Sequence, residues 1–178
     1  VGILLSQGCA VSSRQAADSA SALRRPSEPS WQRISSFSTA FDRTESERAH
    51  NIRRAAERLD GVVIPAHGSF SFNRTVGPRS IARGYRVAPV LMLEGARPAL
   101  GGGICQVSTT IYNAALYADL QVAKRYAHSR PIRYVPLGRD ATVSWGSKDL
   151  VVKNQRNFPV RLRTLVRNGR LLVELYAP

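Results

Sequence analysis

Two apolar segments near the C-terminus, residues 159–166 and 171–176, set the strongest limit on how this chain folds. The pair Asn168-Gly169 lies between them, and Asn-Gly is the preferred filling of a two-residue hairpin turn because both positions need positive φ angles. Valine and leucine alternate with charged residues along both segments, so one face is expected to be buried and the other solvated. The pattern predicts a C-terminal β-hairpin.

The rest of the chain alternates between helical and strand-like segments. Thr44 and Glu47 form a capping-box pattern ahead of apolar residues at helical spacing, which predicts a helix over residues 45–59. A second helix is expected to begin at Cys105 and to end near residue 118. Further strands are predicted at residues 62–65, 121–126, 141–145 and 150–153, with long loops and short strands over residues 73–98. The predicted class is α+β: two helices packed on a mostly antiparallel sheet, with long Gly/Pro/Arg-rich loops.

The N-terminal 30 residues differ from the remainder. Residues 2–10 resemble the end of a lipoprotein export signal, with Cys9 as the lipid acceptor, although Ser6 stands where leucine is usual and no basic segment precedes it. A frayed end with an incidental cysteine is the alternative. Residues 11–30 have the composition of a linker. We therefore expect an export segment and linker at 1–30, a domain at 31–178, and a possible membrane tether through Cys9.

The amino-acid composition limits the classes of binding partner that this chain can have. With 178 residues, 43% hydrophobic and 21% charged, the chain can form one folded domain, and wholesale disorder is excluded. The formal net charge is +14, and only three of the 26 basic residues are lysines. Such an arginine-rich surface attracts polyanions. No basic helix, RNP-like motif or zinc-ligand spacing accompanies the charge, so we expect no nucleic-acid partner.

Cys105 is the residue that best indicates chemistry. It follows Gly101-Gly102-Gly103 at a predicted helix start, where unpaired N–H groups and the helix dipole favour a thiolate. Gly102 and Gly103 would let the main chain approach a substrate, and N–H groups near Cys105 and Gln106 could face an oxyanion. A small buried hydrophobic cysteine beside a packing turn is the alternative. With two cysteines and three histidines, no structural metal site, disulfide scaffold or cofactor is expected.

Two histidines compete for the role of base. His128 lies at the end of a strand-like segment, from which its ring could reach back to the helix start, and His67 is the second choice. Asp140 could orient the imidazole as a third member. A solvated histidine and an aspartate paired with neighbouring arginines are the corresponding alternatives.

Several motifs together resemble the VanW family over residues 36–176. They are Phe70-Ser71-Phe72-Asn73, Val76-Gly77-Pro78-Arg79 with Gly84-Tyr85, the ten residues GGGICQVSTT from Gly101 to Thr110, Tyr112-Asn113-Ala114-Ala115, His128-Ser129, and the segment from Tyr134 to Val143. Two departures are the segment Pro65-Ala66-His67-Gly68, where a Gly-acid pair is typical, and the size of the chain, because many relatives carry extra wall-binding or partner domains.

The resemblance implies a cell-wall function. Some VanW-domain proteins are L,D-transpeptidases of peptidoglycan, which assigns the nucleophile to Cys105 and the base to His128. It also implies an exported protein of the periplasm or cell envelope that acts on peptidoglycan stem peptides. Stem peptides carry carboxylates, so nearby arginines would have a use as fork-like donors. The expected substrate contacts are Arg79, Arg130 or Arg139, with Tyr85, Gly102, Gly103, Gln106 and Ser108.

Two other functions remain open at this stage. In the first, the domain is a non-catalytic peptidoglycan-binding module in which Tyr85 or Tyr134 lines a peptide groove. In the second, ranked last, the basic surface binds nucleic acid. The oligomeric state, the acceptor stem and the balance between crosslinking and hydrolysis do not follow from the sequence.

Overall fold

The fold was analysed in a computed structural model that describes residues 1–2, 30–92 and 95–178. The chain divides into two units, residues 1–30 and the compact unit from Trp31 to Pro178. The predicted export segment, linker and Cys9 lie outside the described residues. No helix in the described part of the chain is both long and apolar enough to cross a membrane.

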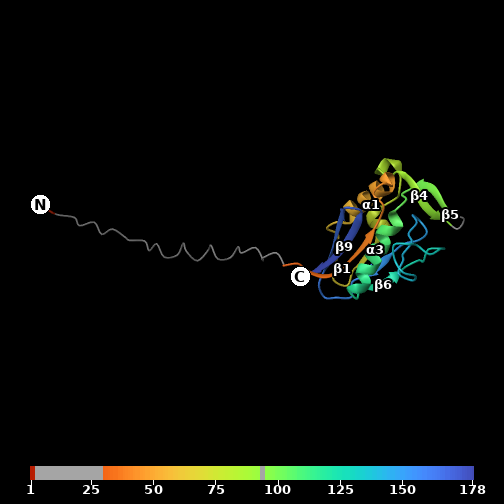
Figure 1. Cartoon of the computed structure of the whole chain (residues 1–178). Coiled ribbons are helices and arrows are strands. Elements are labelled where there is room, and N and C mark those ends of the chain that lie inside the picture. The colour runs from red at the N-terminus through yellow and green to blue at the C-terminus, as the bar shows by residue number, and fades with distance from the viewer. Residues whose placement is uncertain (3–29, 93–94) are drawn as a thin grey trace. The chain divides into compact units, whose positions relative to one another are not determined.

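The compact unit mixes short strands with a few helices (Figure 1). The strands and helices follow in the order β1 (Gln32–Ala40), α1 (Ser46–Leu59), β2 (Val63–Ile64), β3 (Ser69–Ser71), α2 (Phe72–Val76), a 3-10 turn η2 (Ile81–Arg83), β4 (Val87–Met92), β5 (Gly95–Leu100), α3 (Ile104–Tyr117), β6 (Gln121–Lys124), β7 (Val151–Lys153), β8 (Val160–Arg167) and β9 (Arg170–Ala177).

The largest sheet is antiparallel, with the strand order β1-β9-β8-β2. Arg167 pairs with Arg170 across the β8–β9 turn, and Asn168 and Gly169 both adopt positive φ angles of 51° and 72°. This confirms the predicted hairpin. Alternate side chains of β9 are buried against the helices, as the hydrophobic pattern requires.

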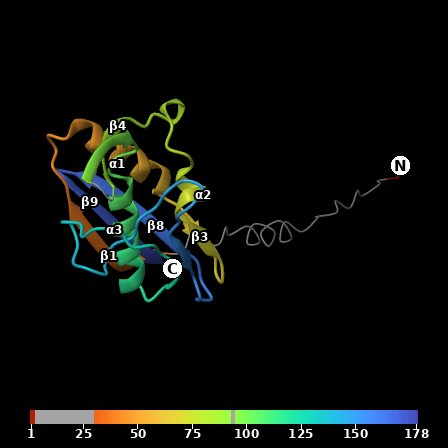
Figure 2. The same ribbon diagram turned by 90° about the vertical axis from the view of Figure 1, so that its right-hand side faces the viewer.

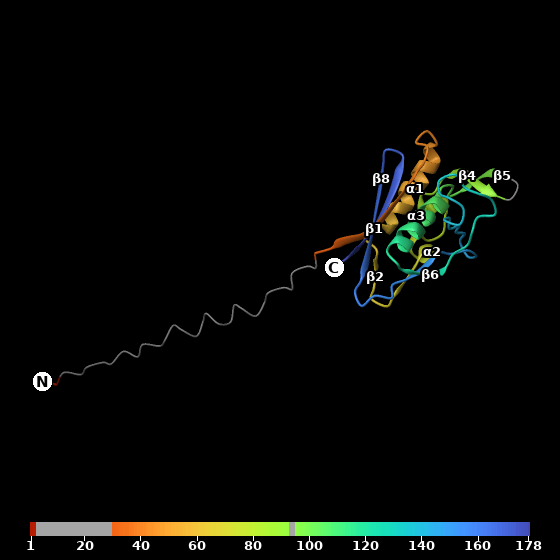
Figure 3. The ribbon, with the colours of Figure 1, turned by 60° about the horizontal axis from the view of Figure 1, so that its bottom comes forward.

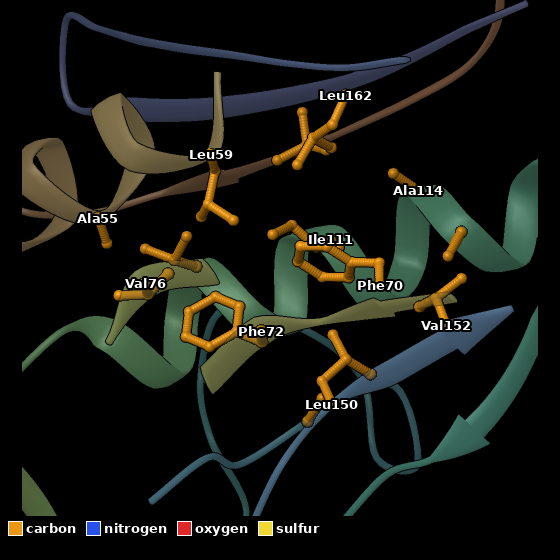
Figure 4. Close-up of a cluster of buried hydrophobic side chains, with 14 of the residues drawn as sticks. Ala55, Leu59, Phe70, Phe72, Val76, Ile111, Ala114, Leu150, Val152 and Leu162 are labelled. Carbon is orange, nitrogen blue, oxygen red and sulfur yellow. The ribbon is translucent and has the colours of Figure 1, made fainter. Parts of the chain in front are cut away.

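Helices α1 and α3 cover one face of this sheet, and α3 runs across the strands (Figure 2). Ile111 and Ala114 of α3 lie between Leu162 of β8 on one side and Leu150 and Val152 on the other (Figure 4). A second sheet, ordered β3-β7-β6, contributes Val152 to that opposite side. Helix α3 is therefore the central element of a layered core, and its burial fixes the position of its first turn.

Strands β4 and β5 form a separate two-stranded hairpin. It projects from the side of the domain opposite the four-stranded sheet (Figures 1 and 3). Gly101 follows β5 directly and donates its N–H to the Arg86 carbonyl at 3.1 Å. The hairpin therefore leads into the glycine-rich turn at the start of α3.

The α+β class and both long helices are confirmed, while several local predictions need correction. The serine-rich strand β1 and the short helix α2 were not predicted. The capping box does not form, because Asp42 Oδ1 accepts from both the N–H and the hydroxyl of Thr44, and α1 begins without a side-chain cap. Residues 141–145 are not a strand. Their polar groups bond to α3 instead, where the Ala141 carbonyl accepts from the hydroxyls of Ser108 and Thr109.

Candidate active site

Cys105 is the second residue of α3, as the glycine pattern predicts. The preceding Gly103 is the N-cap and has a φ of 102°, in the left-handed region that favours glycine. A Cβ on Gly102 would lie only 2.6 Å from the Pro89 carbonyl oxygen. Both glycines thus allow the tight turn that brings the thiol to the surface end of a buried helix.

The Cys105 thiol is half-buried and surrounded by hydrogen-bonding groups. Its Sγ lies 3.4 Å from Thr142 Oγ1 and 3.5 Å from the Val143 carbonyl oxygen, and it also interacts with the His128 ring. Burial raises the pKa of the thiol, but hydrogen bonds with His128 and Thr142 lower it by more, so the pKa lies below its ordinary value. This environment favours the thiolate.

His128 connects the thiol to Asp140. Its Nδ1 lies 2.6 Å from Asp140 Oδ2, and its backbone N–H donates to the same oxygen at 2.6 Å. Because Nδ1 is hydrogen-bonded to Asp140, Nε2 is the ring nitrogen that is available to interact with the thiol. Burial lowers the pKa of His128, while hydrogen bonds with Cys105 and Asp140 raise it by more, so the pKa lies above its ordinary value. The ring is oriented and readily protonated.

Asp140 is held as a carboxylate by groups on both of its oxygens. Burial raises its pKa, but the two bonds from His128 and the charge of Arg125 lower it by more. Arg125 Nη2 donates to Asp140 Oδ1 at 2.7 Å, and its Nε donates to the Asp140 carbonyl at 2.6 Å. The sequence analysis did not identify Arg125. Its position three residues before His128 in a basic chain carried no distinguishing pattern.

Cys105 and His128 line a groove with a volume of about 380 Å³. One wall comes from the β4–β5 hairpin through Pro89, Val90, Leu91 and Ala96, and the other comes from residues 131–134. Arg48, Gly101, Gly103 and Gln106 complete the described lining, in which no residue is acidic. The groove is the size of a small-ligand site, with apolar walls and a few polar groups around the thiol.

The main chain at the start of α3 offers one oxyanion donor of the expected kind. The Gln106 N–H donates to the Gly103 carbonyl at 3.0 Å, so it is already used. The Cys105 N–H has no backbone carbonyl partner in the described part of the chain. This N–H lies beside the thiol and is the donor that could stabilise a tetrahedral oxyanion.

Two predicted substrate contacts do not reach the groove. Tyr85 is only 2% exposed, and its hydroxyl is buried without a hydrogen-bond partner in the described structure. This burial corrects the expectation that Tyr85 contacts substrate. Arg139 stacks over the Tyr117 ring, 5.0 Å from its centroid, at the far end of α3, so it too must be removed from the set.

Arg79 and Arg130, the two remaining predicted arginines, do not line this groove. Arg79 is half-buried, donates to Asn73 Oδ1 at 2.7 Å and packs over the Phe72 ring. Its side chain packs against Gly101 and is not part of the groove lining. Arg130 lines a second cavity of about 240 Å³ beside His128 and Asp140.

Three predicted contacts on α3 and its preceding turn have structural roles. Gln106 and Ser108 are buried, and their side chains bond within the protein. Gly102 is buried against the Ala88 and Pro89 backbone. Only Gly103 and part of Gln106 reach the groove, so the side chain of Ser108 is not available to substrate.

The structure places His128, and not His67, beside Cys105. His67 lies exposed in the turn between β2 and β3, where its N–H donates to the Arg156 carbonyl at 3.3 Å. Sequence reasoning missed Arg48, which lines the groove from α1, and Thr142, which lies next to the thiol although it belongs to a quoted motif. Within the described ranges, no group of three or more His, Cys, Asp or Glu residues could hold a metal ion.

The fold and site together define an α+β domain with a Cys-His-Asp chain at the base of a groove. The chain belongs to the VanW family: the family model described as VanW like protein matches residues 47–176. This confirms the resemblance inferred from the motifs.

Two curated relatives illustrate the similarity. A protein of Bacillus subtilis (strain 168) named uncharacterized protein YoaR is 41% identical over 148 residues, which is 83% of this chain and 49% of the relative. The vancomycin B-type resistance protein VanW of Enterococcus faecalis (strain ATCC 700802 / V583) is 26% identical over 145 residues, 78% of this chain and 53% of the relative. The chain thus spans about half the length of these relatives. No solved structure matches it significantly.

Proposed function

We propose that this domain is a cysteine-dependent acyltransferase of the L,D-transpeptidase type that acts on peptidoglycan stem peptides. The observation that carries the proposal is the Cys105–His128–Asp140 chain, whose thiol and imidazole line an open groove. A nucleophile, a base within reach and a group that orients the base are the arrangement that acyl transfer needs. A relative named for vancomycin resistance is in keeping with a cell-wall substrate.

The thiol and imidazole form an ion pair before substrate binds. The pKa of Cys105 is lowered and that of His128 is raised, so proton transfer from sulfur to nitrogen becomes more favourable. The carboxylate of Asp140 stabilises the resulting imidazolium. The resting enzyme then holds both the nucleophile and the proton needed by the leaving group.

Acylation follows from this pair. The thiolate attacks the carbonyl carbon of the third stem residue, forming a C–S bond, and the Cys105 N–H stabilises the oxyanion. As the C–N bond breaks, His128 Nε2 gives its proton to the departing D-alanine amine. The products are a thioester on Cys105 and free D-alanine.

Deacylation reverses the proton transfer. The side-chain amine of a second stem attacks the thioester carbonyl and loses a proton to His128, and the thiolate leaves. The result is a crosslink between two third residues. When water attacks in place of the amine, the product is a shortened stem, and the enzyme acts as a carboxypeptidase.

The net charge and the N-terminal segment also support a proposal for where the protein acts. We place the protein outside the cytoplasm, in the periplasm or cell envelope, with Cys9 as a possible lipid tether. A net charge of +14 favours a polymer that carries carboxylates. Peptidoglycan, rather than nucleic acid, is the proposed partner.

The test looks for a covalent carbapenem adduct and for the products of stem-peptide cleavage. Purified protein is incubated with a carbapenem, and with stem tetrapeptides, and both mixtures are analysed by mass spectrometry. We expect a carbapenem adduct on the peptide that contains Cys105, together with D-alanine release and crosslinked stems. The Cys105→Ala variant should lose at least about a thousandfold in rate, because the nucleophile is gone. Cys9→Ala is the matched control and should keep full activity.

The opposite result would assign another function. A well-folded wild-type protein that binds peptidoglycan sacculi but forms neither adduct nor product would be the non-catalytic binding module. Salt-sensitive DNA binding without any effect on the cell wall would support the nucleic-acid alternative.

A further inference from the structure

Arg48 holds a positive charge inside the groove. It belongs to the first turn of α1 and lines the groove together with Cys105 and Tyr134. Its side chain is only 16% exposed, and a charged side chain buried to this extent is normally paired. Glu45 Oε2 lies 3.6 Å from its Nε, at a half-exposed position.

Gln106 fixes the direction of the Arg48 guanidinium. Arg48 Nη2 donates to Gln106 Oε1 at 2.6 Å. The amide nitrogen of Gln106 in turn donates to Thr39 Oγ1 at 2.9 Å and to the Ala40 carbonyl at 2.8 Å, so its oxygen must face Arg48. Because Arg48, Gln106 and Cys105 line the same groove, the guanidinium is anchored in the groove that contains the nucleophile.

The stem of Arg48 is also confined. A Cβ on Gly103 would lie 3.1 Å from Arg48 Cγ and 3.2 Å from its carbonyl oxygen, so the helix cap and the arginine pack directly together. A guanidinium that is already ordered loses little further entropy when it binds a ligand. Arg48 is therefore positioned in advance for a partner.

Among the described residues, the acidic partner of this guanidinium is Glu45, which does not line the groove. The described residues give Arg48 Nη1 no partner, and none of the described lining residues is acidic. Tyr134 lines the same groove; burial raises the pKa of its hydroxyl, and a hydrogen bond with Thr109 and the charge of Arg48 oppose that rise. A fixed guanidinium beside a neutral phenol suits a carboxylate, which accepts from both.

We propose that Arg48 and Tyr134 form a carboxylate-binding subsite in the groove of the Cys105 thiol. This subsite binds the free C-terminal carboxylate of the peptide substrate. Since Arg48 and Cys105 line one groove of about 380 Å³, a carboxylate held by the guanidinium lies near the attacked carbonyl, and the shortest such spacing in a peptide is one residue. The groove thus selects peptides that end one residue after the amide that is cleaved. This inference rests on the proposed acyl transfer and names its substrate class.

The test compares one stem tetrapeptide with its C-terminal amide. We expect the wild type to prefer the free acid by about 10- to 100-fold in kcat/KM, the usual effect of one charge-assisted pair. In Arg48→Gln, the preference should shrink to about threefold or less. Arg48→Lys should recover part of it, because lysine keeps the charge but lacks the fork. Arg53→Gln, an exposed arginine on the same helix, is the control and should keep the full preference.

Equal cleavage of acid and amide by the wild type would overturn the subsite while leaving acyl transfer intact. The same holds if Arg133→Gln, which removes the other arginine of the groove lining, abolishes the preference and Arg48→Gln does not. Thermal unfolding of each variant shows that it is folded, and Arg48→Lys replaces Arg48→Gln if the latter does not fold.

A binding measurement separates this inference from the proposed function. In the Cys105→Ala background, calorimetry should show tighter binding of the acid than of the amide, and Arg48→Gln should remove the difference. If the wild type cleaves neither peptide but this binding difference is present, acyl transfer fails and the subsite stands. If the difference is absent, the subsite fails.

Discussion

The described part of the chain contains two β-hairpins with opposite roles. Hairpin β8–β9 lies inside the four-stranded sheet, and its alternate side chains are buried under α1 and α3. Hairpin β4–β5 stands alone, pairs Pro89 with Pro98, and exposes Val87 and Leu91. A two-stranded hairpin is marginal by itself. The first hairpin is part of the core, and the second is a wall of the groove.

The isolated hairpin is held at its base by one buried amide. Asn51 Nδ2 donates to the carbonyls of Arg86 and Gly102 at 2.9 and 3.1 Å, and its Oδ1 accepts from the Arg86 N–H at 2.9 Å. The same residue therefore joins the hairpin to the glycine-rich turn before Cys105. The core and the groove therefore depend on different contacts, so a substitution can alter one without the other.

The largest effect on the groove side is expected from Asp140→Asn. The amide cannot hold the imidazolium as the carboxylate does, so kcat/KM should fall by about 10²- to 10⁴-fold. Without the carboxylate that raises the pKa of His128, the basic limb of the pH–rate profile should also move to lower pH. Rate measurements from pH 5 to about pH 10 with the tetrapeptide check both. An unchanged rate would show that Asp140 has only a structural role.

The core side should respond in stability rather than in rate. Leu175 in β9 is 2% exposed, and Leu175→Ala should lower the free energy of unfolding by about 2–5 kcal/mol through lost burial and a cavity. Leu91 in β4 is 38% exposed, and Leu91→Ala should change the free energy of unfolding by no more than about 0.5 kcal/mol.

Urea unfolding and KM measured on the same two variants complete this comparison. Leu91→Ala should raise KM a few-fold, because it removes apolar surface from the groove wall, while folded Leu175→Ala keeps its KM. If both variants lose stability equally, the β4–β5 hairpin belongs to the core after all.

Regular patterns explain which parts of the fold could be predicted. The Asn168-Gly169 turn and the alternation in β8 and β9 report local geometry and burial together, so the C-terminal hairpin was predictable. Strand β1 was not, because its serines give little alternation and it is defined by pairing with β9, more than 130 residues away. Residues 141–145 looked like a strand but bond to α3, a tertiary effect that propensity does not contain.

The site divides in the same way. Cys105 was recognisable because glycines, helix start and thiol lie within five residues. Arg48 and Arg125 were not, since each is one arginine among 23 and is distinguished only by the partner it meets in space. Tyr85 was assigned to substrate from a motif, but its ring is buried in the core.

The pH dependence of Cys105 alkylation by iodoacetamide reports whether Cys105 and His128 form an ion pair. With Cys9→Ala as the background, the thiol should titrate below its ordinary value near 9. In His128→Gln, the midpoint should rise, because burial then acts with less opposition. A wild-type midpoint at or above the ordinary value of a thiol, or one that His128→Gln leaves unchanged, would show that no such pair forms.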